Sequence, residues 1–219
     1  MRPTVDELHH SDRYVLIESF SIDEMNQFIF RELGMTPPSA DNPPRRTWKT
    51  WLGLLIILLL GGGVGYFVGS LLGGQVKHGN GMSLVWQLVG GLVGLLILLP
   101  IHELIHGLAF KYIGAPHIGY GYSLRSLIVY AYSQLFPTTM REVAFVAVMP
   151  FIIITTSLLI GWAIWPVYKV FWLILLIIHT SACIGDFALI RYYYKNRQRT
   201  IYTYDDVEGE RRSYFFEKV

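Results

Sequence analysis

Charged residues are scarce in this sequence, and the scarcity is confined to its middle. Only 16% of the 219 residues are Asp, Glu, Lys or Arg, whereas soluble domains carry about 25%. Residues 1–50 hold 14 of these charges, residues 191–219 hold 12, and the 140 residues between them hold only 8. This central part is suited to lipid, which excludes an ordinary soluble globule.

Two further shortages exclude other classes of protein. The chain has one cysteine, so it cannot build an internal disulfide framework. Its formal net charge is +2, with both signs mixed in both tails, so it offers no concentrated basic face for nucleic acid. The first apolar run starts at Trp51, which argues against a removable signal peptide. We therefore expect the lipid bilayer as a partner, and no nucleic acid.

The central part contains four apolar stretches that are long enough to cross a bilayer. A bilayer core of about 30 Å needs roughly 20 helical residues, and we expect such helices at 51–74, 83–112, 143–165 and 168–190. Pro150 lies inside the third stretch and should bend that helix and free a backbone carbonyl. The sequence thus predicts an all-α, multi-pass membrane protein with four transmembrane helices.

Basic residues in the loops predict the orientation. They gather before the first stretch, between the second and the third, and after the fourth. By the positive-inside rule, both termini are then cytoplasmic, in a protein that we expect in the cell membrane. The predicted domains are a cytoplasmic N-terminal segment (1–50), a four-helix transmembrane domain (51–190) and a cytoplasmic tail (191–219).

The loop at 114–140 has a different pattern. Tyr120 and Tyr122, and later Tyr130 and Tyr132, alternate with smaller residues. A period of two is typical of strands, and tyrosine is favoured at the membrane interface. We expect a small interfacial β-hairpin between the second and third helices.

The only two acids within the predicted spans are Glu103 and Asp186, and ionisable groups at membrane depth are functional candidates by default. Glu103 belongs to the H-E-x-x-H pattern that starts at His102 and ends at His106. Positions four apart lie one turn above each other on a helix, so both imidazoles can bind one zinc ion while the glutamate reaches a water on it. The alternative is two histidines that only form hydrogen bonds with neighbouring helices.

A catalytic zinc normally has three protein ligands, and the fourth stretch offers two candidates. Depth in the membrane is counted from the basic residue at the end of each span, at about 1.5 Å per helical residue. Asp186 and His106 both lie roughly 8 Å inside, whereas His179 lies roughly 18 Å inside. Depth therefore favours Asp186, and a carboxylate also lowers the net charge of the site. The alternative role for Asp186 is a polar contact with a neighbouring helix. Three roles stay open for His179: a substrate or transition-state contact, an alternative ligand, or a structural residue.

These residues resemble a known family. The motif H-E-L-I-H-G-L closing one span, an aromatic loop, and Gly185-Asp186 near the end of the second span after it resemble the putative zincin peptidases. More broadly, residues 83–190 are similar to the site-2 protease class of intramembrane metalloproteases. That class places Gly after its Asp, whereas Gly185 precedes Asp186 here, and His179 stands where an upstream Asn and Pro are usual.

The resemblance implies a three-helix metalloprotease core formed by the second to fourth helices. It implies one Zn²⁺ per chain held by His102, His106 and Asp186, with Glu103 as the general base. The hairpin with Tyr120, Tyr122, Tyr130 and Tyr132 would present an edge to an extended substrate.

The resulting expectation is a membrane-embedded zinc metalloprotease, in which Glu103 activates a zinc-bound water to cleave a membrane protein or peptide substrate. The alternative is a non-catalytic scaffold or assembly factor with a retained zinc site. A metal transporter would need polar residues through the full depth of the bundle, which the first and third spans lack.

Overall fold

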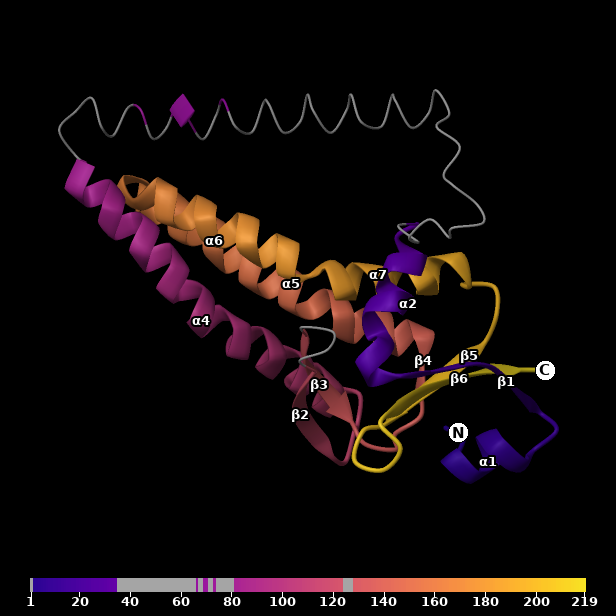
Figure 1. Cartoon of the computed structure of the whole chain (residues 1–219). Helices are drawn as coiled ribbons and strands as arrows, with labels where there is room; N and C mark the ends of the chain where they lie inside the picture. Colours follow the sequence, from indigo (N-terminus) through magenta and orange to yellow (C-terminus); the bar gives the residue numbers. More distant parts are fainter. Residues whose placement is uncertain (1, 35–65, 67–68, 71–72, 74–80, 124–127) are drawn as a thin grey trace, which may run out of the picture.

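Three long apolar helices pack side by side in the computed structural model, which describes residues 2–34, 66, 69–70, 73, 81–123 and 128–219. They are α4 (Gly81–Tyr112), α5 (Met140–Ile164) and α6 (Lys169–Ala182), each in contact with the other two (Figure 1). Their shared core includes Ile105, Ile154 and Leu175. Only 17% of the most apolar window of α4 is buried within the chain, so most of its side chains face outward, as a lipid-facing helix requires.

The last apolar segment is broken. Helix α6 ends at Ala182 and α7 (Ile184–Lys195) begins after Cys183, with a 48° bend between the two. A short 3₁₀ turn, Pro166–Tyr168, precedes α6. Helix α7 contacts α5 and α2, and this bend brings its first turn toward α4.

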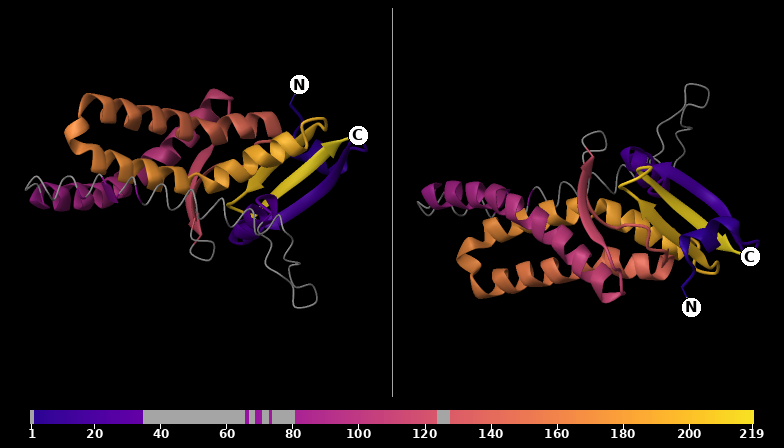
Figure 2. Two further views of the ribbon diagram at one scale, coloured as in Figure 1. Left: turned by 90° about the horizontal axis from the view of Figure 1, so that it is seen from above. Right: turned by 90° about the horizontal axis from the view of Figure 1, so that it is seen from below.

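A four-stranded antiparallel sheet lies at the end of the helix bundle, beside both termini (Figure 2). Its order is β1 (Tyr14–Ser21), β6 (Arg212–Lys218), β5 (Ile201–Asp206) and β4 (Thr138–Thr139). Three short helices accompany it, α1 (Val5–His10), a 3₁₀ turn (Ile22–Glu24) and α2 (Met25–Glu32). One core joins α2, α7 and the sheet through Phe28, Tyr192 and Phe215.

A separate hairpin follows α4. Strand β2 (Ile118–Ser123) pairs with β3 (Ile128–Ser133), with Gly119 opposite Tyr132 and Gly121 opposite Tyr130. A Cβ atom at Gly119 would lie 2.2 Å from the Tyr132 ring. The glycines therefore leave room for the tyrosine rings to cross the hairpin.

The prediction of an all-α protein with four transmembrane helices is wrong. Within the described residues, six strands form two sheets. The same residues contain two helices that could span a membrane, or three if the bent α6–α7 pair is one span. The predicted span at 51–74 lies almost entirely outside the described residues. The four-stranded sheet as a whole was not predicted, because β1 and β6 lie almost 200 residues apart and β4 is distant from β5 in sequence. Only β5 and β6 are consecutive, so only their pairing has a local pattern.

Candidate metal centre

The H-E-x-x-H motif lies on the inner face of α4. His102, Glu103 and His106 are 7–8% exposed, whereas Leu104 and Leu108 point outward and are about half exposed. This division follows from the helix period, since positions 102, 103 and 106 share one side of the helix. The outward leucines suit lipid, and the three polar side chains are left inside the bundle.

Asp186, in the first turn of α7, completes the group. Its Oδ2 atom lies 3.2 Å from His102 Nε2, and its Oδ1 atom lies 3.2 Å from His106 Nε2. The two Nε2 atoms are 3.1 Å apart. Three residues from two helices thus bring metal-binding atoms to within 4.8 Å of one another.

The backbone of α5 fixes the orientation of His106. His106 Nδ1 lies 3.1 Å from the carbonyl oxygen of Val146, and because a carbonyl only accepts, Nδ1 must donate. A neutral His106 then keeps a lone pair on Nε2, which is the atom that faces His102 and Asp186. The Val146 carbonyl is free to accept because its helical partner would be the amide of residue 150, which is Pro150.

The convergent atoms fit a zinc ion. Ligand atoms held about 2.1 Å from a tetrahedral ion lie about 3.4 Å apart. The two imidazole nitrogens are close to this separation at 3.1 Å, and each lies 3.2 Å from a different oxygen of the Asp186 carboxylate. Two imidazole nitrogens and one carboxylate form a donor set typical of catalytic zinc. A hydrogen bond from the other ring nitrogen to a backbone carbonyl, as His106 makes, is the usual support for a ligating histidine.

Glu103 lies beside this group and faces the hairpin. The backbone amide of Ala131, in β3, is within hydrogen-bonding reach of its carboxylate. Among the described residues, none forms a hydrogen bond with the buried Glu103 Oε2 atom. The Oε2 atom is therefore available to a small polar molecule such as water.

A cavity of about 430 Å³ connects the metal-binding group to the four-stranded sheet. Its walls come from α4, β3, α5, α7, α2 and the sheet, and most lining side chains are apolar. They include Phe20, Phe28, Leu98, Phe110, Val143 and Phe215. Tyr130 and Tyr132 line this cavity, whereas Tyr120 and Tyr122 lie on β2, are more than half exposed and are not among its lining residues.

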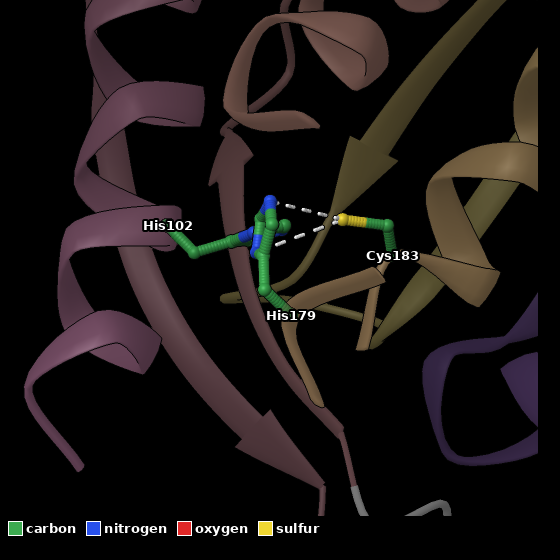
Figure 3. A group of neighbouring side chains, drawn as sticks. All are labelled: His102, His179 and Cys183. Atoms are coloured by element: carbon green, nitrogen blue, oxygen red, sulfur yellow. Dashed lines mark hydrogen bonds between the residues drawn. The ribbon is translucent and has the colours of Figure 1, made fainter. Parts of the chain in front are cut away.

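His179 lies on the other side of His102, at the end of α6. It is 3% exposed and lines the cavity, and the Sγ atom of Cys183 lies 3.8 Å from its Nε2 atom (Figure 3). His179 is not part of the group with His106 and Asp186 but of a second group with His102 and Cys183. Sequence reasoning did not single out Cys183, although its place four residues after His179 could have indicated it.

Comparison with known proteins gives a family match, and it covers this site. Residues 95–201 match the protein family described as putative zincin peptidase, a range that contains the H-E-x-x-H motif, the hairpin and Asp186. Searches of curated proteins and of solved structures gave no match. The family description indicates a metallopeptidase and implies zinc. The match therefore confirms the resemblance of this chain to the putative zincin peptidases, carried by residues 95–201.

Proposed function

We propose that this chain is a membrane-embedded zinc metallopeptidase that hydrolyses peptide bonds of membrane protein substrates in or near the bilayer. The observation that carries the proposal is the convergence of His102 Nε2, His106 Nε2 and one Asp186 carboxylate to 3.1–3.2 Å, next to the buried carboxylate of Glu103. In this proposal, the three residues hold one zinc ion. When bound, zinc makes water more acidic and polarises a carbonyl.

Glu103 is the proposed general base. Its carboxylate takes a proton from the hydrolytic water and returns it to the leaving amine. Two observations support this role: the Ala131 amide in β3 is within hydrogen-bonding reach of the carboxylate, and Oε2 has no hydrogen-bond partner among the described residues. A base that is positioned in this way needs little rearrangement before it reacts.

The proposed substrate is an extended, apolar segment of a membrane protein. The amide of Gln134 donates to the carbonyl oxygen of His117. Hydrogen-bonded and non-hydrogen-bonded residue pairs alternate along an antiparallel hairpin, so the backbone groups of Val129, Ala131 and Ser133 point away from β2. These three residues line the cavity. A helical segment must unwind before its bonds are exposed. Once extended, it can pair with the backbone groups of this edge that Glu103 does not use, while its side chains occupy the apolar cavity.

The proposed topology has both termini on the cytoplasmic side of the cell membrane. The pairing of β1 with β6 supports a common side for the two ends, because strands of one sheet cannot be separated by a bilayer. Basic residues in these segments favour the cytoplasmic side.

The experiment compares new protein termini in membranes of cells that produce wild-type protein, Glu103→Gln or Asp186→Ala. We expect wild-type cells to contain cleaved membrane proteins that both variants lack, since mutation of a general base costs a factor of 10²–10⁴ in rate. Glu24→Gln is the matched control, because Glu24 does not line the cavity, and it should cleave as wild type does.

The same cells test the scaffold alternative. A non-catalytic scaffold predicts that Glu103→Gln restores the phenotype of a deletion strain in full and that its membranes contain the same termini as wild type. Either result would contradict the peptidase proposal.

A further inference from the structure

His179 and Cys183 form a pair that the proposed hydrolysis does not use. They are four residues apart at the end of α6, so they lie on one face, one turn from each other. The Sγ atom of Cys183 is 3.8 Å from His179 Nε2 and 3.9 Å from His179 Nδ1. Both side chains are buried, with Cys183 0% and His179 3% exposed.

His102 reaches the same place from α4. Figure 3 shows its side chain extending from α4 toward His179 and Cys183, and one atom from each of the three side chains lies within 4.8 Å of the others. His102 is 7% exposed, and no described residue forms a hydrogen bond with its Nδ1 atom. A buried imidazole nitrogen without a partner is costly, and a bound ligand would remove that cost.

We propose that His102, His179 and Cys183 form a second cation site, specific for a soft or borderline ion such as Cd²⁺, Cu⁺ or a second Zn²⁺. A thiolate with two imidazoles selects such ions over Mg²⁺ and Ca²⁺, which prefer oxygen ligands. Around a tetrahedral zinc, a sulfur at about 2.3 Å and a nitrogen at about 2.05 Å lie about 3.6 Å apart. The pair at 3.8–3.9 Å needs only a small adjustment.

The second site has a consequence for activity, which rests on the proposed function. His102 belongs to both donor sets, so an ion bound with His179 and Cys183 competes for this imidazole or draws it away from His106 and Asp186. Excess soft cation would then inhibit the peptidase. The cavity that His179 lines gives such an ion a route to the site.

The binding test needs no activity. Cys183 is the only cysteine of the chain, so any cadmium–thiolate absorption in the ultraviolet reports this residue alone. Metal-free, full-length protein in lipid nanodiscs is titrated with Cd²⁺. We expect the band to saturate at one ion per chain, to need at least about tenfold more Cd²⁺ in His179→Ala and to vanish in Cys183→Ala. Asp186→Ala should keep the band, because Asp186 belongs to the other group.

X-ray absorption at the cadmium edge of the unmodified protein covers the case in which His179→Ala does not fold. One sulfur and two imidazole ligands are expected. A missing thiolate band in wild type, or a spectrum with sulfur and no imidazole, would overturn the proposal. So would a His179→Ala variant that folds and binds Cd²⁺ as wild type does. These outcomes do not depend on peptide hydrolysis. If cleavage is also measurable, Cys183→Ala should be less sensitive to inhibition by Cd²⁺.

Discussion

His106 and Val146 are joined across two helices, with the ring Nδ1 of the histidine 3.1 Å from the carbonyl oxygen of the valine. A carbonyl in the middle of a helix is normally occupied by the amide four residues later. Here that residue is Pro150, which has no amide hydrogen. The proline in α5 therefore leaves free the acceptor that orients a proposed zinc ligand on α4.

Replacement of Pro150 by alanine should weaken zinc binding without weakening the fold. The new amide competes with His106 for the Val146 carbonyl, so the ring loses its fixed acceptor. Loss of such a support typically costs 10–100-fold in metal affinity. Thermal stability should be unchanged or raised, because a proline inside a helix is unfavourable. Zinc affinity and thermal unfolding of the metal-free protein are the two measurements.

Ser157→Ala is the control for this experiment. Ser157 lies on the same helix, and its hydroxyl donates only within it, to Ile153 O at 2.8 Å. Wild-type zinc affinity in Pro150→Ala would show that the carbonyl does not position His106.

Zinc should stabilise the folded protein through Asp186. An ion that binds only the folded state at 100 times its dissociation constant adds about 2.7 kcal/mol. A chelator should therefore lower the midpoint of thermal unfolding of wild type. It should have little effect on Asp186→Ala, which lacks the carboxylate 3.2 Å from both imidazoles. Equal chelator effects on the two proteins would exclude Asp186 as a ligand.

The parts of the candidate site that could be predicted from sequence are those set by helix geometry. His102 and His106 share a face because they are four residues apart, and Asp186 was placed at the depth of His106 by counting 1.5 Å per residue. The depth count treated the last span as straight, so it gave no sign of the 48° bend beside Cys183. Nor did it indicate that His179, two turns deeper than Asp186, would form a group with His102.

Contacts between distant segments could not be predicted. Pro150 was expected to free a carbonyl, but nothing local indicates that His106, 44 residues earlier, would use it. The strands that begin at Tyr14 and Arg212 pair with each other in one sheet. The pattern of exposed and buried residues in each strand is explained only by this pairing. As a result, the N-terminal residues that line the cavity, such as Phe20 and Phe28, were not candidates.

The turn after β5 should make the stability of the sheet depend on pH. Partial burial opposes ionisation of Asp206, but hydrogen bonds from Gln134 Nε2 and the amides of Gly209 and Glu210 outweigh it and lower its pKa. A lowered pKa means stability that is present above the unfolded value of about 3.9 and is lost as pH falls through the folded value.

Asp206→Asn should therefore destabilise the protein by about 1 kcal/mol at pH 7, and by much less at a pH well below the folded pKa of Asp206. Chemical unfolding at the two pH values measures the difference, with the exposed Asp12→Asn as the control. A loss of the same size at both pH values would mean that the charge of Asp206 plays no part.

Two adjacent glycines on α4 should respond in opposite ways to alanine. A Cβ atom at Gly90 would lie 3.5 Å from the Phe171 ring, an ordinary contact, whereas one at Gly91 would lie 2.9 Å from Ile174 Cγ2. The close approach of α4 and α6 thus depends on position 91. Gly91→Ala should cost about 1–3 kcal/mol through overpacking.

Gly90→Ala should be neutral or stabilising, since alanine is the better helix former by up to about 1 kcal/mol. Unfolding in detergent measures both variants, and equal effects would show that the α4–α6 contact does not need a small residue at position 91. Because α4 carries His102 and α6 carries His179, separation of these helices should also move the two imidazoles apart. Gly91→Ala should then weaken the cadmium–thiolate band, whereas Gly90→Ala should leave it unchanged.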